Sequence, residues 1–241
     1  MSDPVKSFIL RSGRMSRAQA RSYNGGNSPH IIPYTGKPED FSSRFGNGRS
    51  PVVEIGFGMG TATAEIAAAN PEKNYLGIEV FKAGIGKLLW EIERRNLANV
   101  RIIEHDAVET LKTMFLPGGA RAFHIFFPDP WPKKRHRKRR LVQRPFAELL
   151  VSRLREGGYV YMVSDWEEYA LEALEIFSSI PFIYNPYGGF APGMDWRPAT
   201  KFERKGLEKK YRVREIYVIR GSAGFLQESG HEGKQGPDRS P

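Results

Sequence analysis

The stretch PVVEIGFGMG, residues 51–60, decides the fold. Its apolar first half predicts a short strand, and the glycines at positions 56, 58 and 60 predict a turn where that strand ends. Glycine adopts positive φ and lets the backbone approach a ligand closely. The G-x-G-x-G spacing differs from the phosphate-binding pattern G-x-x-x-x-G-K-[ST]. The same glycines would also suit a tight strand-to-helix turn that binds nothing.

Strands and helices alternate along the chain that follows. Helices are expected at 61–70, 81–96, 107–115, 144–155 and 166–179, and strands at 51–58, 74–80, 100–106, 123–128, 158–165 and 215–220. This order predicts an α/β fold, with a mostly parallel sheet and helices on both of its faces. The region 180–198, which is rich in Pro and Gly, is expected to be a loop.

Acidic residues stand where these predicted strands end, at the edge where parallel sheets bind ligands. Glu54 precedes the first glycine, Glu79 closes the second strand, and Asp106 closes the third. Glu79 is placed to hold ribose hydroxyls, Asp106 to accept from an adenine amino group, and Glu54 to face a positive centre. Each acid alone could be a helix cap or a solvated residue. Together they indicate S-adenosylmethionine rather than NAD or ATP.

The second informative stretch is FFPDPWPKKRHRKRR, residues 126–140. Asp129 lies between prolines that restrict the backbone, and Asp165 likewise follows a predicted strand. Trp131 would either stack on a nucleobase or pack the loop against the sheet. Seven of the eight residues from Lys133 to Arg140 are Lys or Arg.

The net charge of the 241-residue chain is +10, and its distribution is uneven. Residues 1–50 carry +5 and residues 133–140 carry +7, which leaves −2 for the remainder. Two cationic patches on a nearly neutral body predict a polyanionic partner, most simply a nucleic acid, although a basic surface also serves solubility. We expect a basic, partly ordered arm at 1–50, one domain at 51–220 and a disordered tail at 221–241.

Other classes of function are excluded or disfavoured by composition. The chain has no cysteine, which rules out disulfides, zinc–thiolate sites and thiol nucleophiles and fits a cytoplasmic protein. Its first residues contain no long apolar region, so we expect no secretory signal, and no apolar run is long enough to span a membrane. No cluster of residues suggests a metal site. The sequence leaves open whether the protein is a monomer or a homodimer.

Several motifs resemble a known family. EIGFGMG (54–60), GIEV (77–80) and HDA (105–107) resemble the cofactor-binding motifs of class I S-adenosylmethionine-dependent methyltransferases. FFPDPWPKKRHRKRR resembles the signature of the bacterial tRNA (guanine-N7-)-methyltransferases, and VSDWEEYA (163–170) and TKFERKG (200–206) continue the likeness. The resemblance covers roughly residues 50–220 and, more loosely, the basic N-terminus.

The resemblance implies a Rossmann-like sheet of seven strands with one antiparallel strand. It implies methyl transfer from S-adenosylmethionine to N7 of guanine 46 in the variable loop of tRNA. The implied catalytic residue is Asp129. The implied contacts are Glu54, Gly56, Gly58, Glu79, Asp106 and Asp129 for the cofactor; Lys133, Asp165, Thr200 and Glu203 for the substrate; and Arg135, His136, Arg137, Lys138, Arg139 and Arg140 for RNA.

The chemistry of guanine is consistent with these residues. N7 has a free lone pair, so it needs no prior deprotonation, and a nearby carboxylate would stabilise the charge that develops on the ring. Guanine also offers an N1–H and an amino group, which Asp129, Asp165 or Glu203 could accept. Adenine lacks this pair of donors. We therefore predict that Asp129 acts in recognition and electrostatics and is not an obligatory base.

Three other functions are compatible with parts of the sequence. An N6-adenine or N4-cytosine methyltransferase is the nearest, because D-P-x-W resembles the D/N-P-P-aromatic motif of that class. A non-catalytic RNA-binding protein with a methyltransferase fold would share the basic run. A dinucleotide oxidoreductase is disfavoured by the acid that precedes Gly56 and by the glycine spacing. His105 and His136 are expected to have loop or RNA-contact roles rather than catalytic ones.

Overall fold

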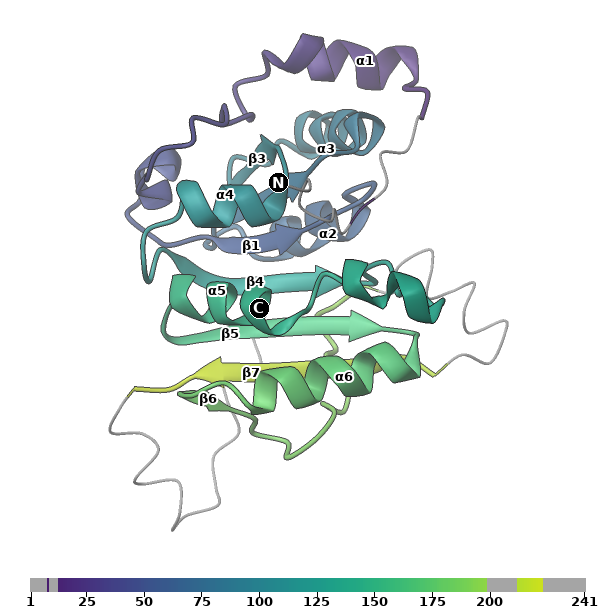
Figure 1. Ribbon diagram of the computed structural model, residues 1–241. Helices are drawn as coiled ribbons and strands as arrows, with labels where there is room; N and C mark the ends of the chain where they lie inside the picture. The colour runs from purple at the N-terminus through teal and green to yellow at the C-terminus, as the bar shows by residue number, and fades with distance from the viewer. Residues whose placement is uncertain (1–7, 9–12, 199–211, 223–241) are drawn as a thin grey trace.

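The fold is a seven-stranded sheet with helices on both faces (Figure 1). The computed structural model describes residues 8, 13–198 and 212–222. The strands run in the order β3-β2-β1-β4-β5-β7-β6. Their bounds are Val52–Ile55 (β1), Tyr75–Glu79 (β2), Val100–Glu104 (β3), Ala120–Phe126 (β4), Leu154–Ser164 (β5), Ile183–Tyr184 (β6) and Arg214–Arg220 (β7).

Strand β7 runs antiparallel to both of its neighbours, β5 and β6, while β1 to β5 pair in parallel. In Figure 1 the arrow of β7 therefore points against those of β4 and β5. The predicted sheet, with seven strands and one antiparallel strand, is confirmed. Strand β6 lies within 180–198, where a loop was expected, and it is only two residues long.

The helices follow the predicted ranges closely. Their bounds are Thr61–Ala69 (α2), Lys82–Arg95 (α3), Ala107–Thr113 (α4), Arg144–Arg153 (α5) and Glu167–Ser178 (α6), with an additional α1 at Arg17–Tyr23. Short 3-10 helices are found at Asn24–Gly26 (η1), Phe41–Phe45 (η2) and Lys134–Arg139 (η3). Helices α4, α5 and α6 lie side by side on one face of the sheet (Figure 1).

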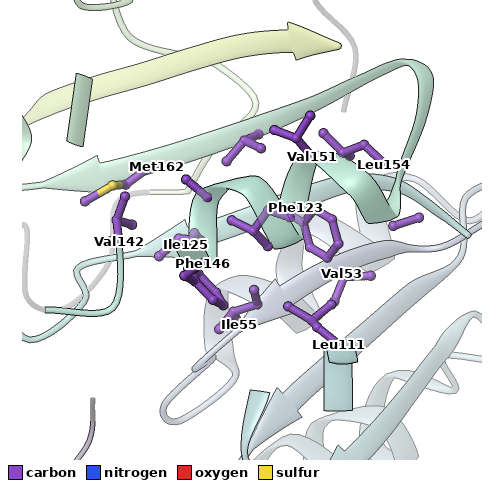
Figure 2. Close-up of a cluster of buried hydrophobic side chains, with 14 of the residues drawn as sticks. Val53, Ile55, Leu111, Phe123, Ile125, Val142, Phe146, Val151, Leu154 and Met162 are labelled. Atoms are coloured by element: carbon purple, nitrogen blue, oxygen red, sulfur yellow. The ribbon is translucent and has the colours of Figure 1, made fainter. Parts of the chain in front are cut away.

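The main core lies between this row of helices and the sheet (Figure 2). Side chains alternate along a strand, so Val53 and Ile55 point into this core whereas Val52 and Glu54 point to the other face. Phe123 and Ile125 of β4 and Met162 of β5 continue the core under α5. These buried apolar side chains fix the register of the strands, and with it the positions of the loops at their ends.

Helices cover one half of the opposite face of the sheet, and an irregular segment covers the other half. Helices α2 and α3 pack over the half formed by β1, β2 and β3. Over β4, β5 and β7, the segment 185–197 takes the place of a helix, and Trp196 stacks on His124 with ring centroids 5.2 Å apart. Burial, with a smaller effect of Lys73, lowers the pKa of His124 to about 3, so its ring is neutral at pH 7.

The N-terminal segment from helix α1 to Ile32 packs on α3 and β3. Helix α1 packs on α3, where Ser22 Oγ donates to Glu93 at 2.6 Å. The Tyr23 hydroxyl donates to Glu104 at 2.8 Å, and the backbone N–H of Ile32 donates to the carbonyl of Ile102 at 2.8 Å. Throughout the described ranges, no helix combines the length and the apolar content that crossing a bilayer requires.

Gly84 provides a test of how closely α3 must approach the glycine turn. A Cβ at this position would lie 1.8 Å from the carbonyl oxygen of Gly58. Alanine in a helix is otherwise favoured over glycine by about 1 kcal/mol. We expect Gly84→Ala to lose about 1–3 kcal/mol of unfolding free energy, because α3 must move away from the turn. Urea denaturation measures this loss.

Gly189→Ala is the matched control, since a Cβ there has no atom within 4 Å. Equal urea midpoints for the two variants would contradict the predicted contact between α3 and the turn.

Candidate functional site

Acidic residues follow one another along the carboxyl edge of the sheet. In spatial order they are Asp106 after β3, Glu79 at the end of β2, Glu54 in β1, Asp129 after β4 and Asp165 after β5. Neighbouring strands are about 4.8 Å apart. The strand ends predicted to carry acids therefore share one edge, and they flank the point between β1 and β4 where the order of the strands reverses.

The glycine turn lies at the centre of this edge. Gly56, Gly58 and Gly60 have φ values of 69°, 57° and 65°, all in the left-handed region that favours glycine. A Cβ at Gly60 would lie 2.6 Å from Leu88 Cβ, so this glycine serves packing against α3. At Gly56 and Gly58 a Cβ would meet no atom within 4 Å. The backbone of these two residues is therefore open to a ligand.

Glu79 connects the turn to the end of β2. Its carboxylate accepts hydrogen bonds from the backbone N–H of Gly58 at 2.8 Å, Val80 at 2.7 Å and Phe81 at 3.0 Å. A carboxylate has about four acceptor positions, so one remains for a ligand hydroxyl. A ribose that bound through both hydroxyls would have to replace one of the three N–H donors.

Glu54 is a buried acid, and no Lys or Arg within the described ranges pairs with it. Its side chain points under α2, where Thr63 Oγ1 donates to Oε2 at 2.7 Å. Burial, with a smaller repulsion from Glu79, raises the pKa of Glu54 to about 7, although the Thr63 bond opposes the shift. A cationic ligand group beside this carboxylate would lower the pKa and stabilise the ionised form.

Asp106 has a structural role as well as a place at the site. Its Oδ1 accepts from the backbone N–H of Glu109 at 2.9 Å and so caps α4, whereas Oδ2 has no partner within the described part of the chain. The preceding His105 stacks on Tyr34 with ring centroids 3.5 Å apart. Tyr34 thus brings the N-terminal segment to the same end of the sheet.

The turn around Asp129 begins where β4 ends. The backbone N–H of Phe127 donates to the carbonyl of Val163 at 2.8 Å and extends the pairing with β5. Phe127 and Trp131 have φ values of 51° and 44°. Such conformations cost bulky residues about 1–3 kcal/mol each and cluster at functional sites. Asp129, which is half-buried, is therefore held between two strained residues.

Trp131 packs within the loop. Its side chain is nearly buried, and the guanidinium carbon of Arg139 lies 3.8 Å from the centroid of its ring. His136 meets the ring edge-on at 5.9 Å. Of the two roles considered for Trp131, this arrangement favours packing over stacking on a base.

The basic run has an inner and an outer side. Arg140 is only 2% exposed, and Arg137 pairs with Glu168 at 2.8 Å. A phosphate cannot reach a guanidinium that the protein encloses, so the prediction that Arg140 contacts RNA must be corrected. The exposed outer side consists of Lys133, Lys134, Arg135 and Lys138.

A buried polar network holds the segment that precedes the predicted substrate residues Thr200 and Glu203. Arg197 donates from Nη2 to Glu215 at 3.0 Å and from Nε to the Tyr161 hydroxyl at 3.1 Å. Tyr161 in turn donates to Glu215. Arg197 therefore anchors the chain to β5 and β7. Thr200 and Glu203 themselves lie outside the described residues.

Several of these functional contacts were not predicted. Thr63, Tyr34 and Arg197 have no signal in the local sequence that identifies their partners. Glu168 and Glu172 do have such a signal, because they stand four residues apart in a predicted helix and therefore share a face. Within the residues that the structure covers, no group of three or more His, Asp or Glu could hold a metal ion.

Glu54→Gln tests the environment of the buried acid. Because its pKa rises from 4.5 to about 7 on folding, the folded protein keeps a proton in this range that the unfolded chain releases. The wild-type protein therefore has its full unfolding free energy below pH 4.5, the pKa in the unfolded chain. It loses part of that free energy as the pH rises to about 7, the pKa in the folded protein. When the pH is raised from about 5 to about 8, the unfolding free energy of Glu54→Gln should increase by up to about 3 kcal/mol relative to that of the wild type.

Urea unfolding at both pH values measures this gain. The exposed acid Glu148 of α5 provides the control, and Glu148→Gln should follow the wild type. If the unfolding free energies of Glu54→Gln and the wild type changed equally with pH, the buried carboxyl would not be protonated as inferred.

Comparison with known proteins identifies relatives over most of the chain. A family model described as "Putative methyltransferase" matches residues 49–216. A tRNA (guanine-N(7)-)-methyltransferase of Bordetella parapertussis is 45% identical over 90% of this chain and 85% of that protein. Proteins of the same name from Nitrosospira multiformis and Neisseria meningitidis serogroup A are 46% and 48% identical, over 88% and 84% of this chain and 93% and 85% of their own lengths.

Solved structures share the fold at much lower identity. The antibiotic-resistance methyltransferase Kmr superposes with a TM-score of 0.51 at 14% identity, over 80% of this chain and 95% of that one. An antibiotic-related methyltransferase gives a TM-score of 0.50 at 14% identity, over 80% and 96% of the two chains. At this identity the likeness extends to the fold alone.

Proposed function

Because the chain belongs to the tRNA (guanine-N7-)-methyltransferase family, we propose that it transfers the methyl group of S-adenosylmethionine to N7 of a guanine in tRNA. The target we propose is guanine 46 in the variable loop. The observation that carries the proposal is the line of acids along one edge of the sheet, centred on the open glycine turn and adjacent to an exposed cationic surface.

The residues at the centre of the edge fit the cofactor. S-adenosylmethionine supplies an electrophilic methyl group on a positively charged sulfur. The open backbone at Gly56 and Gly58 leaves room for it, and Glu54 is a buried carboxyl without a cationic partner in the described ranges. Glu79 has an acceptor position left for a ribose hydroxyl, and Asp106 Oδ2 can accept from an adenine amino group.

The transfer requires positioning more than proton chemistry. N7 of guanine has a lone pair in the ring plane, and it must lie in line with the methyl carbon and the departing sulfur. The N7–carbon bond forms as the carbon–sulfur bond breaks, so no proton has to leave the base first. Positive charge then appears on the guanine ring. We assign to Asp129 the stabilisation of this charge from its restrained turn.

Recognition of guanine depends on acceptors for its N1–H and amino group. Asp165, exposed at the end of β5, and Asp129 are two candidates at this edge, and Glu203 is the third by sequence. An adenine in the same place would leave these carboxylates without donors. The exposed cations from Lys133 to Lys138 would hold the phosphates beside the base, which gives affinity and register rather than base specificity.

The product of the reaction identifies the function. Unmodified tRNA is incubated with labelled S-adenosylmethionine and then cleaved chemically at 7-methylguanine. We expect a single cleavage at position 46 and no label in a tRNA with adenine at that position. Label in N6-methyladenine or N4-methylcytosine would support the alternative methyltransferase. Binding of tRNA without any transfer would identify a non-catalytic RNA-binding protein.

Asp129→Asn tests the role of the acid. The variant should lower the single-turnover rate by about 100-fold, because it removes a charge aimed at the developing cation. At saturating substrates, the wild-type rate should not follow the deprotonation of any group through neutral pH. Glu148→Gln, a surface substitution on α5, should leave the rate unchanged. A rate that rises tenfold per pH unit would identify an obligatory base and contradict the assignment.

A further inference from the structure

Arg140 ends the basic run, yet it lies in the interior against the turn that carries Asp129. We propose that Arg140 is a positioning residue for Asp129, which clamps the turn 127–131 to helix α6. This inference rests on the proposed function for its catalytic consequence. The clamp itself is a property of the fold and can be tested without methyl transfer.

The first half of the clamp is a bond to the turn. Arg140 Nε donates to the carbonyl oxygen of Pro130 at 2.9 Å. Pro130 directly follows Asp129, so the bond fixes the Pro130–Trp131 peptide, one residue beyond the acid. The other end of the turn is fixed by the bond from Phe127 to Val163 in β5. Asp129 therefore lies between two points that are tied to separate elements.

The second half of the clamp is an ion pair with α6. Arg140 Nη1 lies 3.3 Å from Glu168 Oε1 and also contacts Glu172 Oε2. These acids are four residues apart and share one face of the helix. The guanidinium carbon lies 5.0 Å from the centroid of the Tyr169 ring, and the Tyr169 hydroxyl accepts from the backbone N–H of Val142 at 2.9 Å. The guanidinium is thus enclosed on the helix side as well.

Stability alone does not account for this arrangement. The Arg140 side chain has no exposed surface, and its Nη2 has no hydrogen-bond partner among the described residues. Burying a charged group with an unpaired donor is costly. Replacing a buried ion pair with apolar residues is often neutral or stabilising. A positional role explains why a guanidinium stands here.

The strained backbone of the turn 127–131 explains why position 140 requires an arginine. Phe127 and Trp131 both have left-handed φ values, so the turn would relax if it were not restrained. A planar guanidinium can bond a carbonyl through Nε while Nη1 bonds carboxylates in a different direction. The single ammonium of lysine cannot reproduce this geometry. Arg140→Lys therefore keeps the charge and loses the clamp.

The kinetic experiment compares Arg140→Lys with Arg144→Lys in the full-length protein. Arg144 is an exposed residue of α5 that pairs with Glu148. We expect Arg140→Lys to lower the single-turnover rate on unmodified tRNA by about 10- to 100-fold, because small displacements of a catalytic group cost this much. Its affinity for S-adenosylmethionine and the slope of log K for tRNA against log salt should match the wild type. Arg144→Lys should match it in every measurement.

Amide hydrogen exchange provides a measurement that needs no activity. In Arg140→Lys, exchange at Phe127 and Trp131 should become faster, while the amides of β1 and β2 stay protected. If the wild type fails to methylate tRNA, the proposed function fails, and the exchange rates still decide whether the clamp exists. If Arg140→Lys does not fold, Glu172→Gln, which removes one acid of the ion pair, should show the same pattern to a smaller degree.

Three results would overturn the proposal. A salt slope reduced by about one would mean that Arg140 contacts a phosphate. Wild-type rates and wild-type exchange in Arg140→Lys would mean that the clamp has no effect. A lower rate without faster exchange in the turn would mean that Arg140 acts by another route.

Discussion

The parallel pairing of β1 with both β2 and β4 is the constraint on which the site depends. From β1 the chain first builds outward through β2 and β3 and then returns to add β4 and β5 on the other side. The connections that follow β1 and β4 therefore lead to opposite sides of the sheet, and this switch point is where such sheets bind ligands. The glycine turn follows β1 and the Asp129 turn follows β4. A reversed β4 would place Asp129 at the far edge of the sheet.

Buried charged groups at and near the site differ in what compensates them. Arg140, Arg197 and Glu215 have oppositely charged partners within the protein, and they hold loops in place. Among the described residues Glu54 has only the Thr63 hydroxyl as a hydrogen-bond partner, and burial raises its pKa to about 7. The paired groups serve architecture. Glu54 is a carboxyl whose charge becomes favourable only when a cation arrives, which is the electrostatic property that a sulfonium or ammonium ligand would use.

The sequence predicted the sheet well because long apolar runs determine strands and an apolar face determines a helix such as α3. It could not predict β6, since two residues carry no period. Nor could it separate the inner from the outer cations of residues 133–140, because a run of identical charges contains no local sign of which side is buried. Only the position of Glu168 and Glu172 on α6 decides that Arg140 points inward. Residue spacing and composition likewise could not predict contacts between distant segments, such as that of Tyr34 with His105.

The division of the basic run also explains how so many cations can stand beside a strained acidic turn. The buried Arg140 and the partly exposed Arg137 are neutralised by acids of α6, including Glu168, which pairs with both. Acids also suit this position because the first turn of a helix favours negative charge. The outer cations repel one another until a polyanion neutralises them. The continuous segment from Pro130 to Arg140 thus exposes cations on one side and holds the Asp129 turn on the other, so a surface suited to a polyanion and the restraint on the acid are built from the same stretch of chain.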